Sequence, residues 1–503
     1  MGKGPEAEVY SRDDASSNQA EKQIVPLQWK LLSLLLVTVI GFGSQWSSGI
    51  TSAMKSTIKK EMHINNTRFA LLEASEDFMV TALMLVSGLI TDRIGGAGAM
   101  LYGNAIYSIG SILVAGGAQT RSYNFMIAGR VIRALGDIAT QAAQYKVFSS
   151  WFAPSGGFAS TIGFQLGIGK LGAFAGKSSA NIIAKRTGDF AWVFWIAVFM
   201  NLFTNVMTVI FYFFTRVAWK KFPGTHDPAT GEKLVEKTKK FEIKKVFDLP
   251  WSFWCVMLFS LFETSTAIVF LQNATELAEQ RFGTSSITAG WYTATLQYAG
   301  FFVVPVLGVF LDLLGHRVSI MVFCGIGVFL SMLLVCFAND IPGTAASFGI
   351  FAFAYCFGPV TIIDSIRTSL WHSSVFGSAY AVKITMNNAM NIIVRIITGV
   401  IQDADNNSYD RVTIVYVVLA GCSVVISTIL VITTWKSVDI GHLQWTRKQR
   451  IAKGSELVER KRVFYEENGA RNKLISKVAF GTLLLLVMGS WAGYFWGVAT
   501  GNN

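Results

Sequence analysis

The sequence predicts an all-α membrane protein made of two six-helix bundles related by a pseudo-twofold axis, followed by an extra C-terminal transmembrane helix. Three observations support this fold class. The 503-residue chain is 52% hydrophobic and only 15% charged, whereas soluble domains carry about 25% charged residues. Twelve apolar segments are long enough to cross a bilayer. Two motifs recur in the second half of the chain at one common offset, which indicates a duplication.

The chain begins with a polar segment, residues 1–29, that lacks the apolar core of a signal peptide. We therefore expect a disordered cytoplasmic tail. An N-terminal bundle is expected over 30–215 and a C-terminal bundle over 251–435. The spans of the first are 30–50, 68–90, 98–117, 122–143, 157–182 and 190–215. Those of the second are 251–275, 288–311, 317–338, 344–366, 376–402 and 411–435.

Two basic segments separate and follow the bundles. Residues 216–250 carry nine Lys or Arg against five acids, and residues 436–477 carry eleven against five. With twelve spans both segments lie on one side, and the positive-inside rule makes that side cytoplasmic, together with the N-terminus. Residues 478–500 form a thirteenth apolar segment without any charge, which we expect to cross the membrane, with a helix lying in the interface or packed on the bundle as the alternative.

A polar face on the fourth span is the first candidate site. Arg130, Arg133, Asp137, Gln141 and Gln144 fall within roughly an 80° arc of one helix. Each charge at a helix centre costs about 2.5 to 3.5 kcal/mol to insert. Such a face is tolerated when it lines a wet cavity or meets partner charges. It is therefore either a salt-bridge cluster that locks helices together or a solute-contacting face inside a transporter.

The repeated motif lies after the second and eighth spans. Its first copy contains Gly88, Asp92, Arg93 and Gly95, and its second contains Gly308, Asp312, Gly315 and Arg317. Asp92 and Asp312 are 220 residues apart, and the same offset relates Gly157 to Gly377. Glycines allow two helix ends to approach closely, and an aspartate is favoured near the N-terminus of the next helix. We expect a hinge or gate at each copy rather than a solute contact.

These motifs resemble the major facilitator superfamily over essentially all of residues 30–435. The loop Gly88–Gly95 is similar to that family's signature between helices two and three, with Gly96 and Ala97 in place of the usual basic pair. Arg130 with Gly136 is similar to the family's second motif, whose arginine faces the central cavity. The resemblance implies the major facilitator fold, in which helices 1, 4, 7 and 10 line that cavity.

Within the superfamily the chain resembles the branch of lysosomal dipeptide transporters. The likeness rests on Gly129-Arg130, residues 147–152, residues 163–166, Gly377-x-Ala379-Tyr380, Asn388, Gly399 and Asp403. That branch uses an acid on helix four and a base on helix five. The resemblance puts Lys170 at the base position, while Asp137 stands one residue before the acid position, which is Ile138 here. Lys170 and Asp137 could bind each other or the two ends of a zwitterion.

Other polar residues complete the candidate set. Glu263 is the best acid of the second half, and it could bind an ammonium group, carry a coupling proton, or close the cavity through Arg130 or Arg133. Asn387 could contact solute or act as structural glue between helices. Glu73, Glu76 and Asp77 are interpreted as a solvated entrance at the outer surface. Three carboxylates, Glu263, Asp137 and Asp77, are eligible for proton coupling.

The resulting hypothesis is a secondary transporter that moves a small zwitterionic solute, dipeptides foremost, by alternating access. Its predicted solute contacts are Arg130, Arg133, Asp137, Gln141, Lys170, Glu263 and Asn387. An organic anion or monocarboxylate carrier is the first alternative, and a receptor or scaffold without transport is the second. We expect no enzyme, cofactor, metal or nucleic-acid partner, because the sequence shows no catalytic set, metal-ligand spacing or nucleotide motif. A vacuolar, lysosomal or plasma membrane location, a functional monomer and room for an accessory membrane protein complete the expectation.

Overall fold

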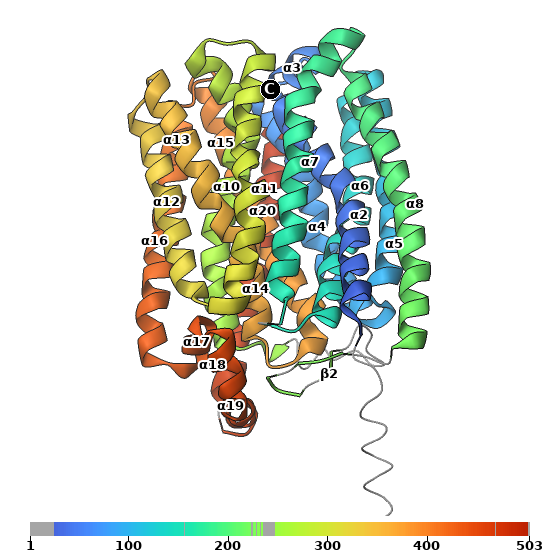
Figure 1. Cartoon of the computed structure of the whole chain (residues 1–503). Helices are drawn as coiled ribbons and strands as arrows, with labels where there is room; N and C mark the ends of the chain where they lie inside the picture. The colour runs from blue at the N-terminus through green and yellow to red at the C-terminus, as the bar shows by residue number, and fades with distance from the viewer. Residues whose placement is uncertain are drawn as a thin grey trace, which may run out of the picture.

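The computed structural model describes residues 25–154, 156–222, 225–227, 229–231, 233–234, 247–467 and 469–500. Its long helices lie side by side in one bundle (Figure 1). The first half contributes α2 (Leu27–Ala53), α4 (Asn66–Ile94), α5 (Gly96–Gln119), α6 (Tyr123–Trp151), α7 (Phe158–Thr187) and α8 (Ala191–Lys221). The second contributes α10 (Trp251–Phe282), α11 (Ser286–Leu314), α12 (Arg317–Phe337), α13 (Ile341–Ala354), α14 (Gly358–Ser369), α15 (Phe376–Ala404) and α16 (Asp410–Lys436).

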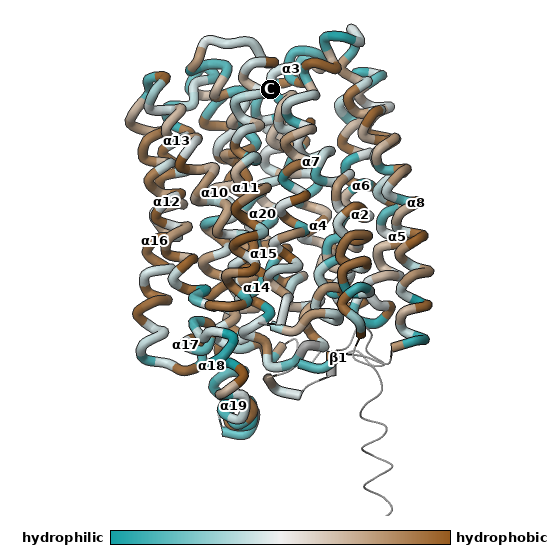
Figure 2. The backbone as a smooth tube through the Cα atoms, viewed as in Figure 1, coloured by the Kyte–Doolittle hydropathy of each residue, from teal (hydrophilic) through white to brown (hydrophobic). Residues whose placement is uncertain are grey.

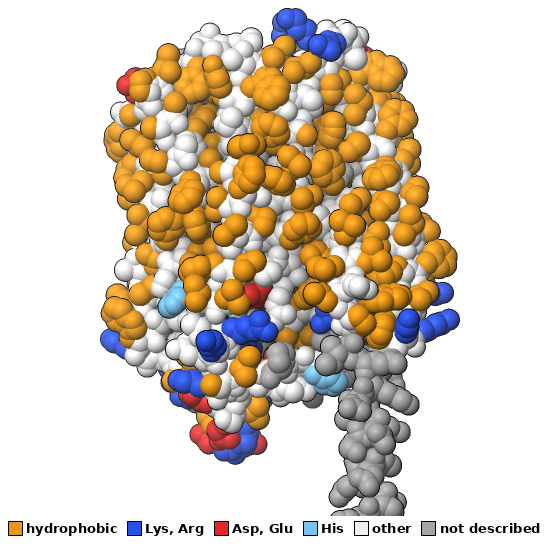
Figure 3. Space-filling model, in the orientation of Figure 1, with side chains coloured by type: hydrophobic (Ala, Val, Ile, Leu, Met, Phe, Trp, Pro, Cys, Tyr) orange, Lys and Arg blue, Asp and Glu red, His pale blue; other side chains and the backbone are white. Residues whose placement is uncertain are grey.

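The two ends of the bundle differ in charge. The "basic end" carries the strands β1 (Thr225–His226) and β2 (Lys233–Leu234) and the short helices α17 (Val438–Gly441), α18 (Arg447–Ala452) and α19 (Gly454–Glu466). The opposite, "α3 end" carries α3 (Lys55–Met62). Apolar side chains cover the surface between the ends, and Lys and Arg gather mainly at the basic end (Figure 3). Such an apolar band is what a bilayer requires.

Hydropathy varies among the helices (Figure 2). Among the described residues, ten helical stretches are long and apolar enough to cross a membrane, with α13 and α14 taken together as one. The long helices α4, α6 and α7 are not among the ten. They carry the charged candidates Asp77, Arg130 and Lys170, because they face the interior of the bundle, where polar side chains find partners.

The ends of the elements differ from the expectation at several places. The helix α2 begins at Leu27, inside the predicted tail, whose residues 1–24 lie outside the described residues. Part of the linker, including 235–246, lies outside them as well. The tenth span is broken by a 3-10 turn, Tyr355–Phe357, before Gly358 and Pro359. Proline has no N–H to continue the helical ladder, so it stands in the first turn of α14.

The two halves meet along two helix pairs, α4 with α15 and α7 with α11. Glycine permits these close approaches. A Cβ atom added at Gly88 would lie 2.6 Å from Ala381 Cβ, and one added at Gly163 would lie 2.7 Å from the Val304 carbonyl. Each pair joins one helix of the first half to one of the second, so both pairs must rearrange if the halves rock against each other.

The last helix, α20 (Gly469–Thr500), satisfies the length and hydropathy of a membrane span and ends toward the α3 end. It packs on α15, α4 and α10. Trp491 Nε1 donates to Thr81 Oγ1 at 2.8 Å, and the Tyr494 ring stacks on Phe78 with centroids 4.9 Å apart. At the basic end, Asn472 Nδ2 donates to the Leu249 carbonyl at 3.3 Å. The helix therefore covers the seam between α4 of the first half and α15 of the second.

Candidate functional site

The arginines of α6 are buried in an ion-pair cluster close to the α3 end. Arg130 and Arg133 are 1% and 7% exposed. Arg130 Nη1 lies 2.7 Å from Glu73 Oε1, and Arg133 Nη2 pairs with Glu76. Both acids come from α4, about two to three turns from its start. The interpretation of Glu73 and Glu76 as a solvated entrance is wrong, because both carboxylates neutralise arginines inside the bundle.

A third arginine extends this cluster across the two halves. Arg395 of α15 places Nη1 3.1 Å from Glu73 Oε2 and Nε 3.1 Å from Asp77 Oδ2. Three cations and three anions thus balance in a buried region, where an unpaired charge would be costly. Glu73 and Glu76 are three residues apart on α4, and Arg130 and Arg133 are three residues apart on α6. This match was the available sequence signal for the pairing.

The arginine cluster leaves donors unused. Arg130 Nε and Nη2 are buried and have no hydrogen-bond partner within the described part of the chain. Buried N–H groups are nearly always satisfied in folded proteins. A carboxylate or a water molecule reaching this guanidinium would satisfy them. Arg130 is therefore both a structural ion-pair partner and a potential anion contact.

Asp137 and Gln141 lie further along α6, near its middle. Gln141 Nε2 donates to Asp137 Oδ2, and both side chains are half-buried. Asp137 and Lys170, both within the described residues, form no ion pair with each other. The direct salt bridge that the sequence suggested for the empty state is therefore not formed. Both groups instead retain capacity to bind a solute.

Lys170 and Glu263 come from opposite halves and stand near the middle of their helices, α7 and α10. The Lys170 ammonium lies 4.6 Å from the ring centroid of Tyr355, in the 3-10 break of the second half. It makes no hydrogen bond or ion pair with another described residue. A cation over an aromatic face is held less strongly than one in a buried ion pair, so this ammonium remains available.

Glu263 is fully buried against the same break. Thr264 Oγ1 donates to its Oε2 at 3.0 Å, and Cys324 Sγ lies 3.6 Å from its Oε1. A Cβ atom added at Gly358 would come within 2.2 Å of Glu263 Oε1, so a larger residue there would displace the carboxylate. The carboxylate lies within electrostatic range of Lys170 and of Lys383 on α15. Sequence reasoning did not include Lys383 among the solute contacts.

Asn387 lies one turn after Lys383 on α15. Its Nδ2 donates to Ser260 Oγ at 3.0 Å, which ties α15 to α10 within the second half. Its Oδ1 is buried without a hydrogen-bond partner among the described residues. The amide nitrogen therefore joins two helices of the second half, as the structural interpretation predicts, and the amide oxygen remains an unused acceptor.

Both copies of the glycine–aspartate motif join the two halves at the basic end. Asp92 Oδ2 accepts from the Ser378 N–H of α15 at 3.1 Å, and its Oδ1 lies 2.8 Å from Lys146 Nζ. Asp312 Oδ2 accepts from the Ser160 N–H of α7 at 2.7 Å. The aspartates thus cap the N-termini of helices in the opposite half. The sequence predicted only a favourable position near the start of the next helix, and it did not predict these caps between the two halves.

The remaining motif residues take different positions. Gly95 and Gly315 both have positive φ, 91° and 69°. Arg93 is exposed, whereas Arg317 is fully buried with Nε 2.5 Å from Asp364 Oδ2. Asp364 thus pairs with the second motif copy. Arg317 Nη1 also donates to the Leu443 carbonyl at 3.3 Å, which attaches the segment after α16 to this gate.

A separate ion-pair network joins the halves at the α3 end. Lys55 Nζ lies 2.9 Å from Glu276 Oε2, and Lys59 Nζ lies 2.5 Å from Glu276 Oε1. Asp403 of α15 accepts from the Asn66 and Thr67 N–H groups at the start of α4, at 3.1 and 2.9 Å. Polar contacts between the halves therefore close both ends around the Lys170–Glu263 region.

Comparisons with known proteins agree with this architecture. A sequence profile described as Major Facilitator Superfamily matches residues 34–394. The human lysosomal dipeptide transporter MFSD1 is 22% identical over 391 residues, which cover 75% of this chain and 81% of the relative.

Two solved structures share the fold. The proton:xylose symporter XylE superposes with a TM-score of 0.64 at 13% identity, covering 85% of this chain and 98% of that one. The transporter FucP in its outward conformation superposes with a TM-score of 0.57 at 14% identity, covering 78% and 97%.

Proposed function

Because the chain belongs to the major facilitator superfamily, we propose that it moves a small zwitterionic solute, most specifically a dipeptide, across its membrane by alternating access. The chain is a multi-pass membrane transporter by family and fold. The dipeptide assignment draws support from the name of the human relative, at 22% identity. It also draws support from the chemistry of the interior charges.

The observation that carries the proposal is the placement of Lys170 and Glu263. One is a cation from the first half and the other an anion from the second, and no ion pair joins them. A dipeptide carries a carboxylate and an ammonium group, which Lys170 and Glu263 can bind at opposite ends. Such a solute would link the two halves, as a substrate must when its binding drives their closure.

The arginine cluster has two roles in this proposal. Its Arg395 contacts with Glu73 and Asp77 close the α3 end, and they break when that end opens. Arg130 offers its two unused N–H groups to a solute carboxylate, and Arg133 holds Glu76. Asp137, Gln141 and Asn387 complete the solute contacts with polar groups that can rotate toward the interior.

The gate at the basic end is formed by the two aspartates of the repeated motif. Asp92 and Asp312 each hold a helix N-terminus of the opposite half, and Arg317 holds Asp364. Opening this end requires that both caps separate, with Gly88, Gly95 and Gly315 permitting the helix ends to move. Arg93, exposed beside Asp92, would contact the lipid surface.

One observation favours an organic anion as the second candidate solute. Lys170 and Lys383 both lie within electrostatic range of Glu263, so two cations surround this one carboxylate. A monocarboxylate would bind the lysines without needing Glu263. Replacing Glu263 by Gln separates the candidates, because dipeptide transport would fall while anion transport would persist.

The proposed orientation places the basic end in the cytoplasm, according to the positive-inside rule. A lysosomal or vacuolar membrane agrees with the human relative's name. We propose that the monomer transports, since both halves of the solute site are in one chain. An accessory membrane protein would dock on the outside of this unit.

Uptake into proteoliposomes tests the function. Purified protein is reconstituted, and uptake of labelled dipeptides, monocarboxylates and sugars is measured with and without a pH gradient. We expect dipeptide uptake that falls at least about tenfold in Lys170→Ala, since one charge-assisted contact contributes about 1.5 to 3 kcal/mol. Lys448→Ala, an exposed lysine at the basic end, is the matched control and should transport normally. Uptake of none of these solutes by folded protein would favour a receptor or scaffold.

A further inference from the structure

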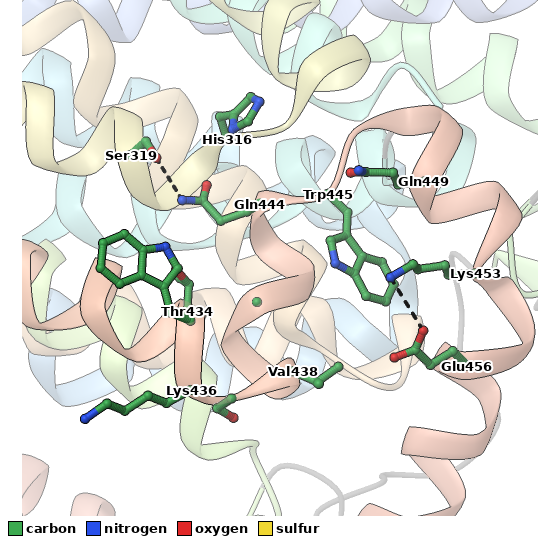
Figure 4. A pocket seen from close by; sticks show the side chains of 13 residues that line it. His316, Ser319, Thr434, Lys436, Val438, Gln444, Trp445, Gln449, Lys453 and Glu456 are labelled. Atoms are coloured by element: carbon green, nitrogen blue, oxygen red, sulfur yellow. Dashed lines mark hydrogen bonds and ion pairs between the residues drawn. The ribbon is translucent and has the colours of Figure 1, made fainter.

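A pocket of about 570 Å³ lies at the basic end, outside the solute site (Figure 4). It is enclosed by the start of α12, the last turn of α16, and the segment from α17 to α19. We call it the α16–α19 pocket. The side chains that matter for its chemistry are Trp435, Lys436, Gln444, Trp445, Gln449 and Lys453.

The pocket lies where the membrane surface meets the basic end. Along α16, the apolar side chains of Val425, Ile429 and Ile432 are exposed on the outer surface, and Trp435 in the last turn is 81% exposed. Tryptophan is enriched at the level of lipid headgroups, where its apolar ring and its N–H both find partners. The row of apolar residues followed by Trp435 therefore leads from the acyl-chain region directly to the pocket.

Cationic groups and donors line the opening. Lys436 and Lys453 lie on opposite sides of the lining (Figure 4), with the ammonium of the exposed Lys436 pointing outward, so this side chain must turn inward to reach a ligand. Lys436 makes no ion pair or hydrogen bond with another described residue, and Lys453 Nζ is 4.7 Å from the Trp445 ring centroid. Lys453 also lies 3.9 Å from Glu456, in a pair whose side chains are about half exposed and therefore weakly held.

The amide of Gln449 adds another donor group. Gln449 uses its Oε1 to accept from the Thr446 N–H at 3.0 Å, which leaves its NH₂ group for a ligand. Gln444 Nε2 donates to Ser319 Oγ at 2.8 Å and so fixes the wall between α12 and η3 (His442–Gln444). Ammonium and amide N–H groups around one opening match a phosphate group, which only accepts hydrogen bonds.

We propose that the α16–α19 pocket binds the headgroup of an anionic phospholipid from the adjacent leaflet. The phosphate lies between Lys436 and Lys453, and the acyl chains run along the exposed face of α16. A phosphatidylcholine headgroup has no net charge, whereas the extra carboxylate of phosphatidylserine leaves that headgroup negative, so the lysines favour anionic lipids. Basic residues just outside a membrane span attract anionic lipids in general, and here the pocket concentrates them at one place.

The pocket borders the gate of the second half. The His316 N–H donates to the Gln444 carbonyl at 3.3 Å. A Cβ atom added at the neighbouring Gly315 would come within 2.2 Å of the Trp445 carbonyl oxygen. A bound headgroup would therefore hold the segment after α16 against the Gly315 loop.

Binding of short-chain lipids to the full-length protein tests the proposal. Protein in neutral detergent is titrated with dioctanoyl phosphatidylserine, dioctanoyl phosphatidylcholine or inorganic phosphate, and bound lipid is counted by native mass spectrometry. We expect phosphatidylserine to bind with at least about tenfold higher affinity than phosphatidylcholine. The variant Lys436→Gln/Lys453→Gln should lose that preference, and Lys436→Arg/Lys453→Arg should keep it.

The matched control is Arg447→Gln/Lys448→Gln, which removes the same charge from exposed residues outside the pocket lining. It should bind phosphatidylserine as the wild type does. Equal loss in both double variants would overturn the proposal in favour of diffuse charge attraction. Equal affinity for the two lipids would also overturn it. Inorganic phosphate that displaces the lipid completely at millimolar concentration would show a site for soluble phosphate instead.

Discussion

Lys55 offers the sharpest test of the closure at the α3 end. It joins the first half to the second through Glu276, at 2.9 Å, and is only 3% exposed. Its ammonium also donates to three neutral oxygens of the second half, Asn273 Oδ1, Gln402 Oε1 and Tyr409 OH, at 2.8 to 2.9 Å. Lys55→Met keeps an unbranched side chain one atom shorter than lysine and removes all of these contacts.

The free energy that Lys55→Met removes from the closed state depends on which ion-pair partners Glu276 keeps. Removing one member of a buried ion pair costs about 3 to 5 kcal/mol. Lys59 still neutralises Glu276, so we take about 2 to 3 kcal/mol as the loss specific to the closed state. Since 1.4 kcal/mol corresponds to a factor of ten, the equilibrium should shift toward an open α3 end by roughly 30- to 150-fold.

Spin-label distances across the α3 end measure this shift. Labels on the exposed positions Lys60 and Ala404 report the separation of the halves, in a background without the five native cysteines. The distribution should move to longer distances in Lys55→Met, and Glu276→Gln in the same background should move it in the same direction. An unchanged distribution in correctly folded Lys55→Met protein would refute the assignment of this network as a closure.

Three further perturbations have definite expected outcomes. Asp312→Asn removes the charge that caps α7 from the opposite half. Spin labels at the basic end should therefore separate, while those at the α3 end stay together. Separation at both ends would contradict a local gate. Trp491→Phe keeps an aromatic side chain but loses the hydrogen bond to Thr81. The free energy of unfolding should therefore fall by about 1 kcal/mol, which lowers the melting temperature. An unchanged melting temperature would show that α20 does not stabilise the seam. Burial holds the pKa of His442 at about 4, below its usual value of 6.5, so the unfolded state binds more protons between these values. Stability should therefore rise with pH from about 4 to 6.5 by up to about 3 kcal/mol, and His442→Gln should flatten that part of the profile measured by thermal unfolding.

Much of the fold was predictable because its signals are local or periodic. Span length and hydropathy depend on neighbouring residues alone, and the repeat was visible because Asp92 and Asp312 share the offset that relates Gly157 to Gly377. The sequence also identified the polar face of α6, since helical periodicity places Arg130 and Arg133 on one side. The break at Tyr355–Phe357 was missed, although Gly358-Pro359 was its local signal.

The contacts of the candidate site were harder to predict, because they depend on packing between distant segments. Nothing in the sequence places Arg395 opposite Glu73, 322 residues away. For the same reason the sequence did not reveal that Asp92 caps α15. The position of Lys383 near Glu263 was not predicted, because it arises only when α15 packs beside α10.

Access of solvent to the interior from both sides is the most direct test of alternating access. Asp137→Cys places a thiol on the half-buried face of α6, in the background without native cysteines. A membrane-impermeant thiol reagent is applied to sealed vesicles of either orientation, with and without a dipeptide. Alternating access predicts labelling from each side and protection by the dipeptide. Labelling from one side only, or from neither, in folded protein would contradict a transport pathway between the two halves.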